Sequence, residues 1–316
     1  ALRPVMARHL YQSAGPSRLW YVLMFGFFSL VLVRIVVVSA ASYGLSRYAL
    51  EMVVRVLVLE LLPLAASLFV AMRCAIPYGS EVAALRANGR FAAWREQGVD
   101  PMRQEVLPRV VAGVFAVWLC TALSAVLTLV VSYLVVYGFT PYGWAPYTRT
   151  VGQVFGPAVT LVFVVKTLLF SLAVAVVPMA AATQDNPANS ISAEIQGLVR
   201  MFTLLLLFEA LSNLLSNSIK FTPVGGTVML RGVNAGGQTR IEVHDSGPGI
   251  PEAEREAVFQ RFYRAEGGQP QGGFGLGLSI VAAIVSLHGF SLEVGSSDLG
   301  GAKLVLDCRQ SLIENS

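Results

Sequence analysis

The sequence predicts two structural classes in one chain: an all-α polytopic membrane domain with four or five transmembrane helices, followed by an α/β two-layer sandwich. The first observation is composition. The 316 residues are 55% hydrophobic and only 13% charged, whereas soluble globular proteins contain about 25% charged residues. The second is distribution: long apolar runs fill the chain from Trp20 to Leu207, and charged residues return at ordinary frequency from Lys220 onward.

These observations divide the chain into three parts. We expect an interfacial leader over residues 1–18, a membrane domain over 19–207 and a soluble domain over 208–316. The net charge is only +4, and the arginines of the membrane part cluster at its loops, which indicates membrane topology and no binding of nucleic acid. The three cysteines form no C-x-x-C pair, so we expect no disulfide framework or metal site, and the basic leader has no signal-peptide pattern.

Four apolar segments are long enough to cross a bilayer, which requires about 20 helical residues. They are Leu19–Ala40, Val53–Met72, Val110–Tyr137 and Phe155–Ala182. A fifth segment, Leu198–Leu211, is shorter and contains two charged residues, so the sequence leaves open whether it spans.

The arginines predict the orientation of these segments. Three lie in the leader, and six follow the second segment: Arg73, Arg86, Arg90, Arg95, Arg103 and Arg109. By the positive-inside rule both regions face the cytoplasm, and we expect a bacterial-type inner membrane. The loop between the third and fourth segments has one arginine and an aromatic cluster, so it is expected outside. The cluster consists of Tyr142, Trp144 and Tyr147.

The cytoplasmic loop carries ordered motifs. E-V-A-A-L begins at Glu81, G-V-D-P begins at Gly98, and L-P-R ends at Arg109. Glu60-Leu-Leu-Pro63 precedes them in the second segment. In order and spacing, residues 45–207 resemble the MlaE/YrbE family of ABC transporter permeases, which act in phospholipid transport.

This resemblance implies a lipid substrate in the bilayer and an ABC-type ATPase subunit that acts in trans, and we also expect a homodimer. The residues assigned to the coupling loop are Glu81, Asp100, Pro101 and Arg109. Asp100 suits the start of a short helix, because its carboxylate accepts from free N–H groups and Pro101 has none to lose. The alternative is a solvated loop. Two positions depart from the family pattern, Leu62 in place of glycine and Gly89-Arg90 in place of a polar pair.

Four charged residues, Arg34, Arg55, Glu60 and Lys166, lie at membrane depth, where an unpaired charge costs at least about 2.5–3.5 kcal/mol. Arg55 can pair with Glu51 one helical turn away. Lys166 has no close partner in sequence, so we expect it to face a cavity or another helix. For Glu60 and Lys166 two interpretations remain: a polar lining of a lipid path, or a structural pair between helices.

Four further motifs follow residue 210, among segments that predict an antiparallel hairpin, a helix ending near His288 and two final strands, Phe290–Val294 and Ala302–Cys308. The motifs are Asn213–Pro223, Asp245–Gly249, Phe259–Arg264 and Gly273–Gly277. In this order and spacing, residues 210–307 resemble the ATP-binding domain of histidine kinases, in the GHKL ATPase superfamily.

The resemblance implies ATP and Mg²⁺ as cofactors, and the residue types suit them. The amide oxygen of Asn217 can bind Mg²⁺, Lys220 can approach phosphate, and Asp245 can accept from the adenine amino group. Glycines at a helix start can cradle phosphates, although a plain flexible loop is the alternative. The expected ATP-binding residues are Asn213, Asn217, Lys220, Asp245, Gly247, Gly249, Arg264, Gly273, Gly275 and Gly277.

No catalytic residue is assigned. Hydrolytic members of the superfamily carry a glutamate four residues before the metal asparagine, where this chain has Asn213, and an amide cannot take a proton from water. Phosphotransfer requires a histidine, and residues 183–209 contain none. His244 begins an H-D-x-x-P string but overlaps the adenine-binding turn, and His288 ends a helix. A phosphoacceptor would therefore be a separate histidine-bearing chain or a response regulator.

The junction near residues 207–212 raises a topological conflict. If Leu198–Leu211 spans the membrane, the ATP-binding domain lies outside; if it does not, the domain is cytoplasmic. Three functions remain: a lipid permease with an appended Mg-ATP-binding domain, a membrane sensor histidine kinase of a two-component system acting in trans, or an artificial chimera in which one half works. The sequence does not distinguish a natural from an artificial fusion.

Overall fold

We describe the fold from a computed structural model, over residues 18–42, 44, 48–183, 190–235, 238–260, 263, 275 and 277–308. The chain forms two compact units, Ala1–Leu205 and Leu206–Ser316, whose boundary falls inside one long helix. Each unit is described by itself.

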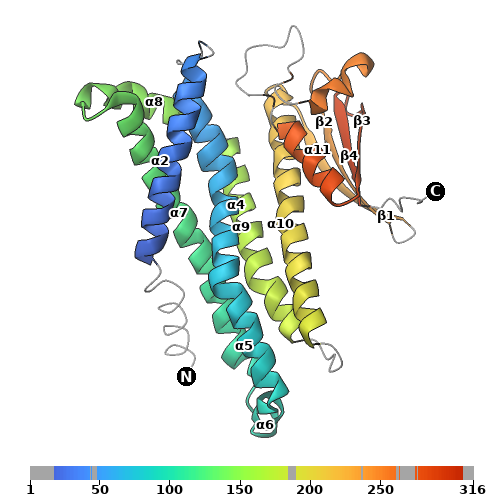
Figure 1. The fold of residues 1–316 in the computed structure, drawn as a ribbon. Coiled ribbons are helices and arrows are strands. Elements are labelled where there is room, and N and C mark those ends of the chain that lie inside the picture. The colour runs from blue at the N-terminus through green and yellow to red at the C-terminus, as the bar shows by residue number, and fades with distance from the viewer. Residues whose placement is uncertain are drawn as a thin grey trace, which may run out of the picture. The chain divides into compact units, whose positions relative to one another are not determined.

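The described part of the first unit is helical (Figure 1). Its elements are α2 (Arg18–Ser42), α3 (Ala49–Met52), η2 (Val53–Leu61), α4 (Leu62–Val70), η3 (Ala71–Ala75), α5 (Ile76–Ala87), α6 (Arg90–Glu96), η4 (Met102–Val106), α7 (Leu107–Tyr137), η5 (Pro141–Gly143), α8 (Trp144–Val154), α9 (Pro157–Ala182) and the first part of α10 (Ser190–Phe221). Five helical stretches in the described residues are long and apolar enough to cross a membrane, so the chain is a multi-pass membrane protein.

The fifth stretch is longer than the sequence suggested. Helix α10 runs unbroken for 32 residues, and its apolar part, Ile195–Phe221, has 27. The prediction of a short segment ending at Leu211 was therefore wrong in length. The helix continues to Phe221, through most of the motif Asn213–Pro223. Length no longer argues against a fifth span.

Three π-helical stretches interrupt the other helices, and each ends two residues before a proline. They are η2 before Pro63, η3 before Pro77 and η4 before Pro108. Proline lacks an N–H and its ring clashes with the carbonyl four residues earlier, so a widened turn upstream relieves the clash.

Small and hydroxylated side chains line the contacts of α7, which packs against α2, α4 and α9. The Ser29 hydroxyl in α2 lies 2.8 Å from that of Thr128. A Cβ added at Gly113 would lie 3.2 Å from the Ala175 Cβ in α9, so the two helices approach closely there. Close backbone approach through small residues is typical of helices packed in membranes.

The loop that the sequence predicts to be cytoplasmic forms a helical hairpin, α5–α6, which turns at Gly89 with φ +72°. Helix α6 ends in a Schellman motif at Gly98 (φ +73°), in which the Val99 N–H donates to Trp94 O at 2.8 Å. The Met102 N–H donates to Asp100 Oδ1 at 3.0 Å, so Asp100 caps a helix. That helix is not the separate short one predicted, because it continues through η4 into α7.

The second unit contains the rest of α10, α11 (Gly277–Leu287), two short 3₁₀ turns, η6 (Glu252–Glu254) and η7 (Ala257–Phe259), and a sheet. The strands are β1 (Val228–Ala235), β2 (Gln238–Asp245), β3 (Ser291–Ser296) and β4 (Ala302–Asp307), in the antiparallel order β1-β2-β4-β3. The predicted hairpin and both final strands are thus present.

The core of this unit lies between the two helices and one face of the sheet (Figure 1). Alternation along β2 and β4 places Val243, Leu304 and Leu306 on that face. The helices contribute Ala210, Leu214, Val281, Ile284 and Val285. The unit is therefore the two-layer α/β sandwich that the sequence predicts. Packing against the sheet holds α10 and α11, the two helices that carry the first and fourth motifs predicted to bind nucleotide.

Candidate functional site

The first and fourth nucleotide-binding motifs meet where α11 begins. A Cβ added at Gly277 would lie 3.1 Å from Asn213 Oδ1 and 3.2 Å from Asn217 Nδ2. Both amides therefore lie close to the start of α11, where Gly277 carries no side chain. Gly275, just before this helix, has φ +66°, a conformation that favours glycine.

This cradle fits a phosphate group with its metal ion. The Asn217 amide is a neutral oxygen ligand of the kind Mg²⁺ accepts, and the first N–H groups of α11 lie beside it. Among the described residues no cluster of three His, Cys, Asp or Glu side chains could hold a metal by itself. A metal here would accordingly depend on phosphate oxygens for its remaining ligands.

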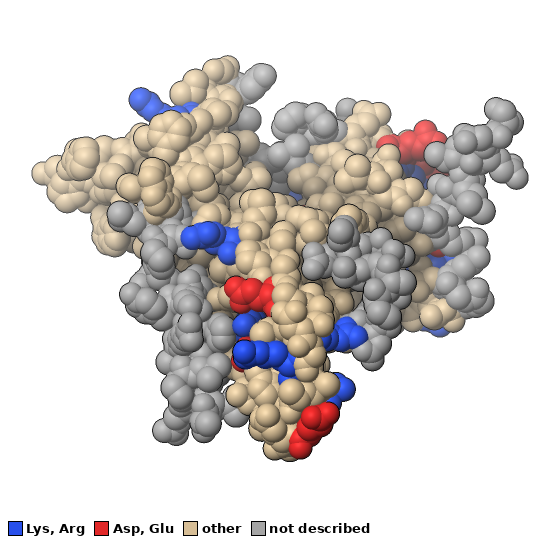
Figure 2. All heavy atoms as spheres, turned by 60° about the horizontal axis from the view of Figure 1, so that its bottom comes forward, with Lys and Arg blue, Asp and Glu red and all other residues tan. Residues whose placement is uncertain are grey.

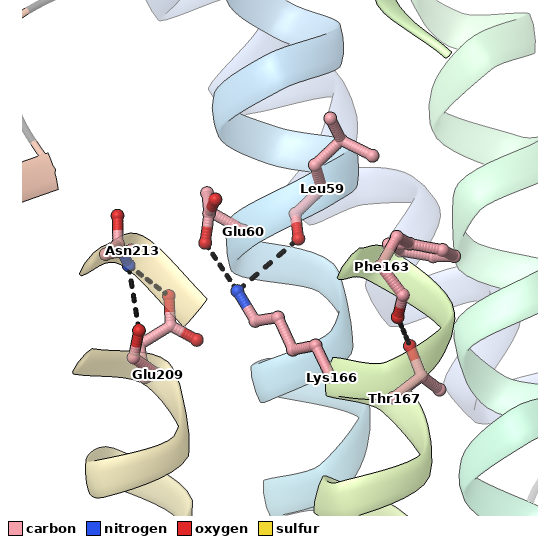
Figure 3. A network of polar contacts seen from close by, with 7 residues as sticks. All are labelled: Leu59, Glu60, Phe163, Lys166, Thr167, Glu209 and Asn213. Atoms are coloured by element: carbon pink, nitrogen blue, oxygen red, sulfur yellow. Dashed lines mark hydrogen bonds and ion pairs between the residues drawn. The ribbon is translucent and has the colours of Figure 1, made fainter. Parts of the chain in front are cut away.

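Asn213 is held from the preceding turn of its own helix. Its Nδ2 donates to Glu209 O at 3.0 Å and to Glu209 Oε1 at 3.3 Å (Figure 3). Both residues are buried, at 6% and 4% exposure. The amide is thus oriented with its oxygen toward Gly277, and the Glu209 carboxylate lies one turn earlier in α10.

Asp245 ends β2 and forms the opposite half of the site. Its Oδ1 accepts from the N–H groups of Gly247, at 3.0 Å, and Ala302, at 2.9 Å. The side chain is 4% exposed. Within the described part of the chain no hydrogen bond engages Oδ2, so this fixed carboxylate keeps one oxygen that can accept from a ligand.

Two glycines permit this arrangement, and one of them was not anticipated. A Cβ at Gly301 would lie 2.2 Å from Asp245 Oδ1 and 2.5 Å from the Gly247 nitrogen. A Cβ at Gly247 would lie 2.8 Å from the Phe221 carbonyl oxygen, which ends α10. Gly249, with φ +74°, packs against Gly301. Gly301 belongs to no recognised motif, and its only sequence signal is the turn dipeptide Gly300-Gly301.

Behind Asp245, His244 is 1% exposed. Its Nε2 lies 3.1 Å from Glu242 Oε2, and its Nδ1 lies 3.4 Å from Ser297 Oγ. An ionised carboxylate can only accept a hydrogen bond. A neutral His244 therefore carries its proton on Nε2, and its Nδ1 accepts a hydrogen bond from the Ser297 hydroxyl. Ser297 Oγ also accepts from the Leu299 N–H at 3.1 Å.

His244 therefore braces the 297–301 turn, whose Gly301 N–H donates to Asp245 O at 3.1 Å. Both ring nitrogens of the buried His244 are thus engaged within this unit. The hydrogen bond with His244 is the main cause that lowers the pKa of Glu242, with Lys303 adding to it and burial opposing it. Lys303 Nζ lies 3.1 Å from the other Glu242 oxygen.

The remaining predicted ATP-binding residues are Lys220, Arg264 and Gly273. Lys220 is half-buried on the last turn of α10, and its Nζ lies 4.7 Å from the centre of the Phe221 ring. Arg264, Gly273 and Phe262 lie outside the described residues.

In the first unit, Arg109 joins the loop hairpin to the third membrane helix. Its guanidinium pairs with Glu105 on its own helix and with Glu81 Oε2 in α5 at 3.3 Å, and it lies 5.8 Å from the centre of the Tyr78 ring. Arg109 is 7% exposed, whereas the Glu81 side chain is 56% exposed. Glu81 can therefore meet a partner while it remains anchored.

The end of the membrane unit formed by α5 and α6 carries exposed charge, as Figure 2 shows from that side. The exposed basic side chains here include Arg90, Arg95 and Arg103. Asp100 adds an ion pair with Arg103 at 3.7 Å. This end thus presents a charged, helical surface outside the apolar segments.

Deeper in the unit, Lys166 of α9 pairs with Glu60 and donates to Leu59 O at 3.5 Å (Figure 3). Leu59 and Glu60 both lie in η2. Lys166 is 3% exposed, and its Nζ lies 5.7 Å from the centre of the Phe170 ring. Of the two interpretations of these charges, the contact supports the structural pair between helices.

Comparison with known proteins assigns both halves. Residues 6–215 match the family model of permease MlaE, and residues 203–311 match that of histidine kinase-, DNA gyrase B- and HSP90-like ATPases. The two matches overlap over residues 203–215, inside α10. The fusion point is therefore a shared helix, with no separate linker between the families.

The curated relatives match the second unit. Adaptive-response sensory kinase SasA of Nostoc sp. is 40% identical over 95 residues, which are 30% of this chain and 24% of that protein. Signal transduction histidine-protein kinase/phosphatase MprB of Mycobacterium sp. is 45% identical over 96 residues, which are 30% and 19% of the two chains. The chain thus spans a quarter or less of these relatives.

Among solved structures, a mycobacterial sensor histidine kinase MprB is 34% identical, covers 34% of this chain and 70% of that chain, and has a TM-score of 0.29. The ATP-binding domain of PrrB from Mycobacterium tuberculosis is 36% identical, covers 33% and 65% of the two chains, and has a TM-score of 0.26. On the two family matches, the chain belongs to the MlaE permease family, and its permease part is fused to an ATPase domain of the histidine-kinase type.

Proposed function

We propose that the second unit binds Mg-ATP, with adenine at Asp245 and the phosphates at the start of α11. The observation that carries this proposal is that residues far apart in sequence converge at two places in this unit. Asp245 offers an oxygen beside Gly247 and Gly301, and Asn213 and Asn217 face Gly277. Asn217 would hold Mg²⁺, which would neutralise phosphate charge.

The test is Mg²⁺-dependent binding of a fluorescent ATP analogue to the full-length protein in sealed vesicles of known orientation. Binding on the face that exposes Arg86–Arg109 would place the site in the cytoplasm, beside cellular ATP. Binding only from the opposite face would mean that α10 spans and separates the site from its ligand. If neither face binds, even in detergent, the nucleotide site is refuted.

For the permease unit we propose lipid transport in a bacterial inner membrane, as a homodimer driven by an ABC-type ATPase in trans. Family membership supports this proposal, and the α5–α6 hairpin supplies a suitable contact surface through Glu81 and Asp100. Co-expression with the ATPase subunit of a related permease, followed by copurification, tests it. The Glu81→Lys variant should no longer copurify with the ATPase subunit. The Gln104→Lys variant, which adds the same positive charge, is the control and should still copurify.

The kinase relatives favour a second candidate function, phosphotransfer. The phosphoryl group would pass to a histidine on another chain, and from that histidine it could pass on to a response regulator. Asn213 supplies no base for water, which favours transfer over hydrolysis. With γ-labelled ATP, we expect no acid-labile label on the chain alone. Label that His244→Ala abolishes, or that His288→Ala abolishes, would instead identify an internal phosphoacceptor.

A further inference from the structure

An acidic side chain that belongs to none of the predicted motifs lies next to the proposed phosphate site. Glu209 is 4% exposed and lies in the part of α10 that belongs to the second unit. In the sequence it is only a charge inside an apolar stretch, Ile195–Phe221. Glutamate is almost never fully buried in proteins unless it has a partner. The contacts of Glu209 therefore indicate why it is there.

The Glu209 side chain and backbone together hold the orientation of Asn213 (Figure 3). Asn213 Nδ2 donates to Glu209 O at 3.0 Å and to Glu209 Oε1 at 3.3 Å. An amide nitrogen has two hydrogens to donate, and Glu209 accepts both. Asn213 Oδ1 therefore points the other way, and it lies 3.1 Å from the position of a Cβ added at Gly277. An oxygen in this place attracts a cation and repels a phosphate oxygen.

Glu209 is also close to the residue proposed to bind Mg²⁺. Glu209, Asn213 and Asn217 follow one another at intervals of four residues, so they lie along one face of α10. Asn217 Oδ1 lies 3.6 Å from the same Gly277 position. The path from Glu209 Oε1 across the Asn213 amide to an ion at this position is about 8 Å. A charge acts over such a distance with little screening in buried surroundings.

This arrangement suits an electrostatic role for Glu209 and not the role of a general base. A base must reach its proton within hydrogen-bond distance or through one water. Here the Asn213 side chain stands between the carboxylate and Gly277, and an amide cannot take up the proton. The carboxylate instead contributes its negative charge, because a nearby divalent cation favours the ionised form.

We infer that Glu209 is a positioning residue that makes nucleotide binding depend on the metal ion. Its carboxylate attracts Mg²⁺ at Asn217, and it keeps the Asn213 oxygen turned toward that ion. The same negative charge repels the triphosphate of ATP when no metal neutralises it. The site therefore selects Mg-ATP over metal-free ATP. This inference rests on the proposed binding of Mg-ATP and adds the origin of its metal dependence.

The test measures two affinities for each variant of the full-length protein in detergent. One is the affinity for the fluorescent ATP analogue with excess Mg²⁺, and the other is the affinity for the same analogue with EDTA. Glu209→Gln keeps an acceptor for Asn213 and removes the charge, so binding should weaken with Mg²⁺ and strengthen with EDTA. The ratio of the two affinities should fall at least about fivefold, the effect of one charge on a divalent ion about 8 Å away in a water-like dielectric.

The controls separate a charge effect from a structural one. Glu293→Gln neutralises an exposed acid of β3 and should leave the ratio unchanged. Because the ratio is taken within one variant, a general loss of folded protein cancels from it. Equal weakening with Mg²⁺ and with EDTA, or no change in either affinity, would overturn the inference. If Glu209→Gln fails to fold, Glu209→Met, an uncharged residue suited to an apolar helix, should show the same fall in the ratio.

The wild-type protein distinguishes failure of this inference from failure of the proposed function. Binding that is equally strong with Mg²⁺ and with EDTA would overturn the selection by Glu209 and leave the nucleotide site in place. Absence of binding under both conditions would refute the nucleotide site and this inference together.

Discussion

Lys166 and Asp245 are both almost completely buried charges, at 3% and 4% exposure, but the chain neutralises them differently. Lys166 meets an opposite charge, Glu60, and the Leu59 carbonyl. In the described part of the chain, Asp245 meets only neutral N–H groups, and only through one oxygen. The first arrangement is closed and holds two helices together, whereas the second retains a negative charge and an open acceptor. The comparison distinguishes a structural charge from a binding charge.

The largest effect is expected from breaking the closed pair. Lys166→Met leaves the Glu60 carboxylate without its ammonium, and removal of one member of a buried pair costs about 3–5 kcal/mol. The double variant Glu60→Gln/Lys166→Met should recover most of this loss. Chemical denaturation of the purified protein measures both. Arg55→Met, which breaks a half-exposed pair with Glu51, is the control and should cost under about 1 kcal/mol.

Asp245→Asn tests the open charge. The amide oxygen can still accept from Gly247 and Ala302, so the fold should remain stable, but an NH₂ group replaces the free acceptor. Loss of a hydrogen bond to a charged group costs about 1.5–3 kcal/mol, roughly 10- to 150-fold in affinity. The Asp245→Asn variant should therefore bind the ATP analogue more weakly, while its thermal unfolding temperature should stay unchanged. Parallel loss of both would assign Asp245 a structural role.

The sequence predicted local features well. Apolar run lengths identified the first four spans, and alternation identified the β1–β2 hairpin, because both depend on neighbouring residues. The partner of Lys166 could not be identified, since Glu60 lies 106 residues away. Gly301 was missed for the same reason: its constraint comes from Asp245 across the sheet. The length of α10 was underestimated because charges at Arg200 and Glu209 suggested an interruption, while packing in both units sustains the helix.

Gly301→Ala sharpens the account of how Asp245 is held. The new methyl carbon would lie 2.2 Å from Asp245 Oδ1, so the 297–301 turn must shift. Overpacking of this kind costs about 1–3 kcal/mol, and ATP-analogue affinity should fall with it. The matched control is Gly295→Ala in β3, where an added Cβ meets nothing within 4 Å. Similar effects of the two substitutions on hydrogen exchange of the sheet would contradict this account.

The smallest effect is a pH dependence behind Asp245. The hydrogen bond with His244 lowers the pKa of Glu242 below its ordinary value of 4.5. Because the pKa is lower in the folded state, the Glu242 carboxylate contributes stability above about pH 4.5, and this contribution is lost as pH falls through the folded pKa. Glu242→Gln should therefore flatten the acid-side decline in protection of the β2 and β4 amides, measured by hydrogen exchange after equilibration between pH 3.5 and 6. Glu293→Gln, at an exposed position of β3, should leave the decline unchanged. If the two variants flatten the decline in protection equally, the Glu242 carboxylate does not cause the pH dependence of this sheet. The distinction between closed and open charges would then rest on Lys166 and Asp245 alone.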